Sequence, residues 1–213
     1  MLGQMMQIPL MISSLLRHAD KYHGDTEIVS RLAEGGTHRY TYRDAHRRSR
    51  QLARALSALG ERIGTLAWNS HRHFEIYFAV SGMGAICHTI NPRLFPEQIT
   101  YIVNHAEDSY IFFDITFVKL VEALAPQCPK VKGWVALTDR DHLPESTMQF
   151  MTYEELVDAQ TDDFEWPQFD ENAASSLCYT SGTTGNPKGV LSSHRATILH
   201  AYAACLPDVM CLS

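Results

Sequence analysis

A long amphipathic helix is the clearest element predicted by the pattern of hydrophobic and polar residues. Thr41 and Asp44 have the three-residue spacing of a capping box, which opens a helix. The apolar residues that follow recur at helical spacing and would form one face: Leu52, Ala55, Leu56 and Leu59. Gly60 then predicts the end of the helix, because glycine commonly follows a helix C-terminus.

A shorter helix and a hairpin are expected before this element. The apolar start of the chain predicts a first helix that ends near Tyr22. Strands are expected at 27–32 and 37–42. Gly35 and Gly36 lie between them, and glycines in such a short link predict a hairpin. The N-terminal region therefore predicts one helix followed by two antiparallel strands.

From residue 62 onward, short apolar segments alternate with amphipathic ones. Strands are expected at 62–68, 85–90, 110–114, 133–138, 175–181 and 189–194. Helices are expected at 73–85, 96–106, 117–125, 153–160 and from about Arg195. This alternation predicts an α/β fold, with a mostly parallel sheet covered by helices and the small antiparallel hairpin near the N-terminus. The polar stretch 139–170 is expected to cross the surface around one short helix.

Composition and charge narrow the class of protein. Of the 213 residues, 45% are hydrophobic and 20% are charged, which is typical of a globular protein. The formal charge of −6 gives no indication of a nucleic-acid partner. No apolar run has the length of a membrane-spanning helix, so no integral membrane segment is expected. The five scattered cysteines form no CxxC pair and favour a reducing compartment, so we expect a cytoplasmic protein.

The densest chemistry lies in the segment YTSGTTGNPKGV, residues 179–190. Its glycines allow backbone N–H groups to approach phosphate oxygens closely. Four hydroxyl groups can add hydrogen-bond donors: Thr180, Ser181, Thr183 and Thr184. Lys188 supplies a positive charge suited to β- and γ-phosphates. A mobile surface loop has a similar composition, so composition alone leaves both readings open.

The segment is not a Walker-type phosphate loop, GxxxxGK[ST]. Counting from Gly182, Pro187 stands where that motif needs its second glycine, and Gly189 stands where it needs serine or threonine. Lys188 follows a proline within a predicted turn and does not open a helix. The helix-dipole contribution of Walker-type enzymes is therefore not expected here.

The segment resembles the signature of the adenylate-forming, AMP-binding superfamily, which includes acyl- and aryl-CoA synthetases, luciferases and peptide-synthetase adenylation domains. The resemblance covers the whole chain. Residues 65–108 resemble fatty-acyl-CoA synthetases, with a helix, a glycine turn and NPRL in that order, and residues 166–201 strengthen the match. Segments 1–6 and 88–102 point to the branch with bacterial medium-chain fatty acid–CoA ligases and 3-methylmercaptopropionyl-CoA ligases.

The resemblance implies a two-step reaction with ATP, Mg²⁺ and CoA. A carboxylate attacks the α-phosphate of ATP to give acyl-AMP and pyrophosphate, and the CoA thiol then displaces AMP. By position, Thr180 is implied to help hold Mg²⁺, and Lys188 is implied to act in catalysis near the leaving pyrophosphate. The residues implied to wrap the β- and γ-phosphates are Ser181, Gly182, Thr183, Thr184, Gly185, Asn186, Pro187, Lys188 and Gly189.

The resemblance also implies that residues 1–213 are an N-terminal fragment of the AMP-binding domain, without the remainder of that domain and the small lid domain. The family's adenine pocket, ribose-binding aspartate and adenylation lysine belong to later segments, so the fragment alone is expected to be inactive. Family members usually carry a longer turn where residues 59–62 join the long helix to the next strand. Either this loop is shortened or several residues are missing from it.

Several functions are compatible with this resemblance. The first is activation of a medium-chain fatty acid as its CoA thioester, with 3-methylmercaptopropionate as the alternative acid in the same branch. An aryl-CoA ligase is a third possibility. A hypothesis of another class is a non-catalytic binding or dimerisation module, because similar synthetases pair through their N-terminal domains. That pairing also predicts a homodimer.

Histidines and arginines outside the loop have simpler interpretations. His71 and His73 lack further metal ligands at suitable spacing. His88 is interpreted as a packed, hydrogen-bonded residue, whereas His194, just past the loop, could approach a nucleotide. Five arginines are interpreted as a solvated helix face, with an anion site as the alternative: Arg43, Arg47, Arg48, Arg50 and Arg54.

Overall fold

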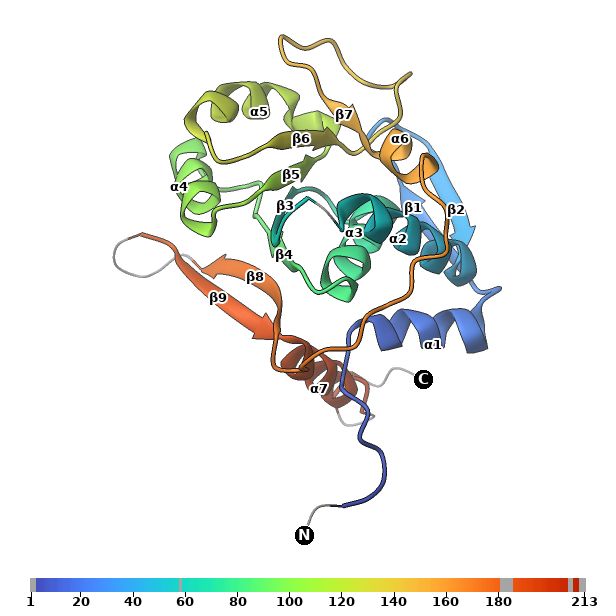
Figure 1. Ribbon diagram of the computed structural model, residues 1–213. Helices are drawn as coiled ribbons and strands as arrows, with labels where there is room; N and C mark the ends of the chain where they lie inside the picture. Colours follow the sequence, from blue (N-terminus) through green and yellow to red (C-terminus); the bar gives the residue numbers. More distant parts are fainter. Residues whose placement is uncertain (1–2, 58, 181–185, 207–208, 211–213) are drawn as a thin grey trace.

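Nine strands form two sheets in the part of the chain described by the computed structural model, residues 3–57, 59–180, 186–206 and 209–210. The larger sheet has seven strands in the order β7-β6-β5-β3-β4-β8-β9, and the smaller one is the hairpin β1-β2 (Figure 1). The strands are β1 Glu27–Arg31, β2 Thr37–Thr41, β3 Arg62–Leu66, β4 Ile86–Thr89, β5 Tyr110–Phe113, β6 Gly133–Ala136, β7 Met151–Thr152, β8 Ala174–Thr180 and β9 Lys188–Ser193.

The larger sheet is mostly parallel, as the sequence predicts. Every neighbouring pair in it is parallel except β8 and β9, which are antiparallel. The hairpin β1–β2 is antiparallel, with Gly35 and Gly36 at positive φ in its turn. The strand β7 was not predicted, because its two residues are too few to show a periodic pattern.

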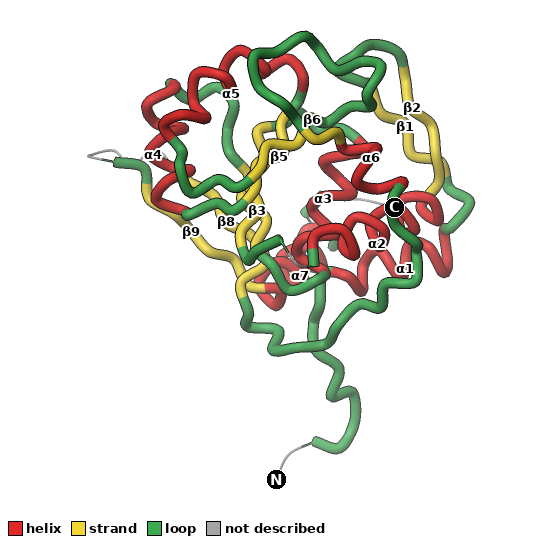
Figure 2. The backbone as a smooth tube through the Cα atoms, turned by 45° about the horizontal axis from the view of Figure 1, so that its top comes forward, coloured by secondary structure: helices red, strands yellow, loops and turns green. Residues whose placement is uncertain are grey.

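Helices cover both faces of the larger sheet. They are α1 Ser13–His23, α2 Tyr42–Leu56, α3 His71–Gly82, α4 Pro96–Ala106, α5 Val118–Leu124, α6 Tyr153–Asp158 and α7 His194–Ala204, with short 3₁₀ turns at Ile115–Phe117 and Ala125–Gln127. Apolar residues of α2, α3 and α6 form one core with one face of the sheet. Those of α4 and α5 form a second core on the opposite face (Figure 2). The domain is therefore a three-layer α/β/α structure.

The start of α2 confirms the predicted capping box. The Asp44 N–H donates to Thr41 Oγ1 at 3.3 Å, and the Thr41 N–H donates to Asp44 Oδ2 at 3.1 Å. The helix ends at Leu56, one turn before the predicted end. Gly60 has φ +137°, and a Cβ there would lie 2.5 Å from Ser109 Oγ. Only glycine fits this tight link between α2 and β3 without strain.

The arginines of α2 differ from the solvated face that the sequence predicted. Arg48 is largely buried, with a side chain that is 13% exposed, and it donates to Glu75 of α3 and Glu154 of α6. Arg50 and Arg54 pair with Asp162 and Asp163 on the segment that crosses the surface after α6. The interpretation as a solvated face is wrong for Arg48, because the spacing of α2 turns its guanidinium toward the buried Glu75 and the partly exposed Glu154.

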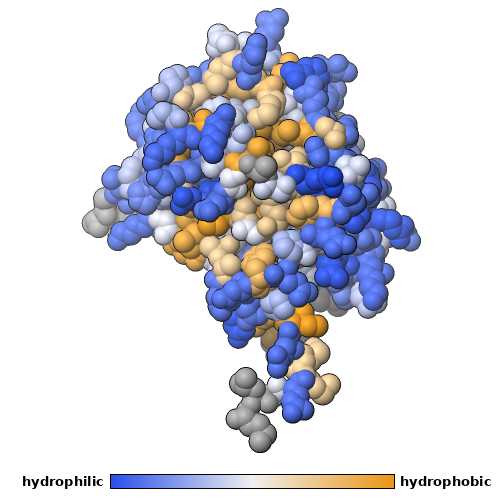
Figure 3. Space-filling view, in the orientation of Figure 1, coloured by the Kyte–Doolittle hydropathy of each residue, from blue (hydrophilic) through white to orange (hydrophobic). Residues whose placement is uncertain are grey.

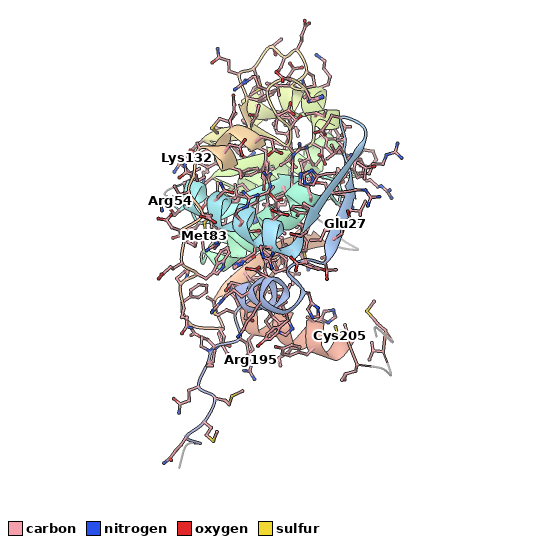
Figure 4. The ribbon with its side chains drawn as sticks, turned by 90° about the vertical axis from the view of Figure 1, so that its right-hand side faces the viewer. Glu27, Arg54, Met83, Lys132, Arg195 and Cys205 are labelled. Carbon is pink, nitrogen blue, oxygen red and sulfur yellow. The ribbon has the colours of Figure 1, made fainter. Side chains whose placement is uncertain are left out.

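Charged groups on the surface form ion pairs, such as those of Arg50 and Arg54. Among the described residues, no helix combines the length and the apolar character that a membrane span requires. Figure 4 shows Arg54 and Glu27 at the outside of the molecule, on α2 and β1 respectively.

Candidate functional site

The carboxyl edge of the larger sheet contains the crevice where α/β proteins most often bind ligands. The chain leaves β3 through α3 to reach β4 on one side, and it leaves β4 through α4 to reach β5 on the other side of β3. Helices α3 and α4 cover opposite faces. Connections that diverge to opposite faces create a crevice outside the carboxyl ends of the strands.

A hollow of about 260 Å³ lies at this crevice. It is lined by residues from the ends of β3, β4 and β8 and from the two helices: Ala67, His73, His88, Thr89, Ile90, Asn91, Leu94, Ile102, Cys178 and Tyr179. The lining combines apolar side chains with polar groups that could orient a small molecule. The hollow therefore lies directly below the point where β8 ends.

The hydroxyl- and glycine-rich segment begins at the same edge. Strand β8 pairs in parallel with β4, with Leu177 opposite His88 and Cys178 opposite Thr89. Its last residue is Thr180, and β9 returns antiparallel from Lys188. The sheet thus carries the segment at its carboxyl edge, beside the crevice.

Thr180 and Lys188 face each other at the base of the segment. They are directly paired across β8 and β9, and both are exposed. Residues that oppose each other in an antiparallel pair extend on the same face, with Cβ atoms about 5 Å apart. A hydroxyl group and an ammonium group are therefore presented side by side, which is a suitable arrangement for phosphate oxygens and their metal ion.

The predicted site residues fall into two groups. The structure describes Thr180, Asn186, Pro187, Lys188 and Gly189. The other five predicted residues lie outside the described residues: Ser181, Gly182, Thr183, Thr184 and Gly185. Lys188 was predicted within a turn, but it opens β9, because its pairing with Thr180 extends the ladder by one residue.

Gly189 packs against an aromatic ring. A Cβ at this position would lie 3.2 Å from both Leu177 Cδ1 and Tyr179 Cζ, closer than most real Cβ contacts. The missing side chain therefore leaves room for the Tyr179 ring across the hairpin. From the sequence, Gly189 was predicted only to contact phosphate and Tyr179 had no predicted role, although both residues belong to the motif.

The two histidines that line the crevice, His73 and His88, are held by hydrogen bonds within the protein. His88 is fully buried, and its Nδ1 lies 2.7 Å from Asp108 Oδ2, which confirms the prediction of a packed, hydrogen-bonded residue. His73 Nε2 lies 3.1 Å from Thr65 Oγ1, and the His71 ring stacks on His38. No group of three or more metal-ligating residues occurs among the described residues.

His194 lies at the wrong end of β9 to approach the segment. It follows Ser193, whereas the segment joins β9 at Lys188, so about six residues of extended strand, roughly 20 Å, separate them. Its Nδ1 accepts the N–H of Ile12 at 3.2 Å, and the side chain is fully buried. The hypothesis that His194 contacts a nucleotide is therefore wrong, and the residue instead joins the start of α7 to the segment before α1.

Burial shifts the pKa of the groups around the crevice. Burial raises the pKa of Asp108, and the hydrogen bond from His88 opposes this shift. Burial and the nearby Asp108 carboxylate raise the pKa of Tyr179 above its ordinary value. The Tyr179 phenol is therefore a neutral hydrogen-bond donor at physiological pH.

These features define an α/β protein with a segment rich in glycine and hydroxyl side chains at the carboxyl edge of its sheet. The chain belongs to the AMP-binding enzyme family, whose sequence model matches residues 15–212. It is 54% identical to the 3-methylmercaptopropionyl-CoA ligase of Ruegeria lacuscaerulensis, over 99% of this chain and 40% of the relative. It is 49% identical to the medium-chain-fatty-acid–CoA ligase of Ectopseudomonas oleovorans, over 100% of this chain and 40% of the relative.

Solved structures agree on the fold. The crystal structure of an anthranilate CoA ligase in complex with anthranoyl-AMP aligns with 88% of this chain and 36% of its own, with a TM-score of 0.74. Its identity of 23% supports the shared fold alone. The chain spans about 40% of the length of the curated relatives it matches.

Proposed function

We propose that the full-length protein containing this chain is an ATP-dependent acid–CoA ligase that activates a medium-chain fatty acid through its acyl-AMP. Membership of the AMP-binding enzyme family and the names of the two relatives support the reaction class. The single observation on which the proposal depends is the pairing of Thr180 with Lys188 at the base of the segment, beside the crevice.

The described residues fit the ATP phosphates and their metal ion. Thr180 offers a hydroxyl oxygen as a ligand, and Mg²⁺ prefers oxygen ligands and usually binds through few protein groups. When bound, Mg²⁺ would neutralise charge on the phosphates and favour departure of pyrophosphate. The Lys188 ammonium is placed to donate to the same phosphates. Gly189 is paired with Tyr179 across the two strands, and its lack of a side chain leaves room for the Tyr179 ring.

The first step requires two anions to meet. The substrate carboxylate forms a bond to the α-phosphorus while the bond to the pyrophosphate oxygen breaks, so negative charge develops on the leaving group. Lys188 would stabilise that charge from the base of the segment. In the second step the CoA sulfur bonds to the acyl carbon, AMP leaves, and the thiol proton is released.

A second acid is favoured by one observation. The relative that shares 54% of aligned residues is named for 3-methylmercaptopropionate, whereas the relative named for medium-chain fatty acids shares 49%. We propose 3-methylmercaptopropionate as the alternative substrate. A panel of both acids with the full-length protein separates the two, and an aromatic acid such as benzoate tests the aryl-CoA alternative.

A non-catalytic module is the alternative of another class, with pairing into a homodimer. Residues 1–213 would then act as the N-terminal part of the AMP-binding domain without the later segments and lid. Incubating the 213-residue chain with ATP, Mg²⁺, octanoate and CoA tests this: acyl-CoA formation would contradict an inactive fragment.

Four free cysteines among the described residues, two of them buried, support our inference of a reducing, cytoplasmic location.

The decisive test of the proposed function is Lys188→Ala in the full-length protein, followed by ATP–pyrophosphate exchange. Loss of one charge-assisted contact costs about 1.5–3 kcal/mol, so we expect adenylation to slow roughly 10- to 150-fold without loss of folding. Lys119→Ala, at an exposed lysine on α5, is the matched control and should leave the rate unchanged. An unchanged rate in Lys188→Ala would refute the role of the segment.

A further inference from the structure

We infer that Tyr179 is a positioning residue, which fixes the direction in which β8 and β9 leave the body and so places Thr180 and Lys188 for the nucleotide. This inference rests on the proposed function. It concerns contacts below the segment, between β8 and the helix α4, that neither phosphate binding nor the catalytic steps require directly.

The backbone of β8 loses its support just before the segment. Its ladder with β4 ends at Cys178, which pairs with Thr89. Tyr179 and Thr180 pair only with β9, through Gly189 and Lys188. The last two residues of β8 are therefore part of a two-stranded hairpin, which is marginal on its own. Figure 1 shows this end of β8 and β9 extending beside α4, away from the centre of the sheet.

The side chain of Tyr179 replaces the missing backbone support. Its hydroxyl lies 2.6 Å from His105 Nδ1 in the last turn of α4 and forms a hydrogen bond with it. The Tyr179 ring lies 5.8 Å from the His105 ring at 87°, and 5.3 Å from the His88 ring. One tyrosine thus joins the hairpin to both α4 and β4.

Each histidine that contacts Tyr179 is itself held in place. His88 is fixed by the 2.7 Å bond between its Nδ1 and Asp108, with both side chains fully buried. His105 stacks on Tyr101 of α4 at 5.4 Å and 28°. Because rings held by packing and hydrogen bonds lose little further freedom, they form a rigid seat for the tyrosine.

Gly189 completes the seat from the other strand. It is the cross-strand partner of Tyr179, and a Cβ there would lie 3.4 Å from the tyrosine hydroxyl and 3.2 Å from Cζ. A side chain at this position would press on the ring and force it to shift. The motif therefore places a tyrosine and a glycine at paired positions, one residue inside the pair formed by Thr180 and Lys188.

Steady-state kinetics of the full-length protein test the inference with Tyr179→Phe and His105→Phe. Each variant keeps an aromatic ring and removes one partner of a single hydrogen bond, so we expect the KM for MgATP to rise on the order of fivefold. The KM for the acid should not change. The KM for MgATP of the double variant should be no higher than that of either single variant, because both substitutions remove the same hydrogen bond.

Tyr110→Phe is the matched control, since this half-buried tyrosine begins β5, at the opposite edge of the sheet from the segment. The substitution should leave the KM for MgATP unchanged. A KM for MgATP that is unchanged in both single variants, or single effects that multiply in the double variant, would overturn the inference. If either protein fails to fold, the other single variant still gives the KM. Slowed exchange in Lys188→Ala with normal kinetics in Tyr179→Phe would leave the proposed function intact and remove only this inference.

Discussion

At the scale of single residues, the segment near β8 shows what a sequence motif contains and what it omits. Thr180 and Lys188 were predicted from residue type and position, and the antiparallel pairing explains why they stand together. Tyr179 could not be assigned a role, because its partner His105 lies 74 residues away. The available signal was the spacing of Leu177 and Tyr179, which are two residues apart and so lie on the same face of β8.

Asp114 provides a test of burial on a single carboxyl group. It is 2% exposed at the end of β5 and accepts the N–H of Trp68. Burial raises its pKa from 3.8 to about 6. Between these values the unfolded chain is ionised while the folded protein keeps the proton, so this group lowers the free energy of unfolding as pH rises from about 4 to 6.

Asp114→Asn should remove that loss, because the amide oxygen can still accept the Trp68 N–H without ionising. The free energy of unfolding of the variant minus that of the wild type should be up to ~3 kcal/mol larger at pH 7 than at pH 4. Urea unfolding at both pH values measures this. The same difference between variant and wild type at pH 4 and pH 7 would contradict the assignment.

At the scale of elements, the strands and helices of the larger sheet were predictable, because buried parallel strands and amphipathic helices have clear patterns. The prediction failed where contacts between elements determine whether a side chain is buried. Arg48 belongs to a polar face of α2 by sequence, yet two carboxylates from α3 and α6 surround it. The network depends on Glu75 and Glu154, which are 27 and 106 residues away along the chain.

Glu75 is the centre of this buried network. It accepts from Arg48 Nε at 3.0 Å and from the Tyr153 hydroxyl at 2.7 Å, and its side chain is fully buried. Glu75→Ala would leave Arg48 and Tyr153 without this partner. Breaking a buried pair in this way costs about 3–5 kcal/mol, so we expect a clear drop in the urea midpoint.

The exposed pair of Glu27 and Arg39 on the hairpin provides the control. Its side chains are 51% and 62% exposed, so Glu27→Ala should cost no more than about 1 kcal/mol. Equal losses for Glu75→Ala and Glu27→Ala would show that the network joining α2, α3 and α6 adds nothing beyond a surface ion pair.

At the scale of the whole molecule, the segment before α1 contacts the start of α7. Ile12, just before α1, donates its N–H to His194 at the start of α7. Leu10 and Arg195 both bond to Glu171, so a second connection lies beside the first. Figure 4 shows Arg195 on α7, and Cys205 just after this helix, at the same end of the molecule as the N-terminal segment. No local sequence pattern could reveal a contact over 182 residues.

The contact between Ile12 and His194 should weaken in acid. Burial lowers the pKa of His194 from 6.5 to about 4, since the charged ring would lose its acceptor nitrogen and its solvation. The unfolded chain binds the proton first, so stability is complete above pH 6.5 and falls as pH drops toward 4, by up to ~3 kcal/mol.

His194→Gln should flatten this decline, because an amide oxygen accepts the Ile12 N–H at any pH. Exposed His200 on α7 is the matched position, and His200→Gln should keep the wild-type decline. Thermal unfolding between pH 4 and pH 7 compares the three proteins. Identical pH profiles for wild type and His194→Gln would contradict the role of this histidine.

The position of β9 at the margin of the larger sheet has a practical consequence for handling these 213 residues alone. Val190 and Leu191 are 46% and 59% exposed, and Figure 3 shows hydrophobic surface in this region of the hairpin. One side of β9 has no neighbouring strand within the described ranges, so its backbone groups are open to pairing. Concentrated samples should therefore self-associate through this strand, and low protein concentration should keep them monodisperse.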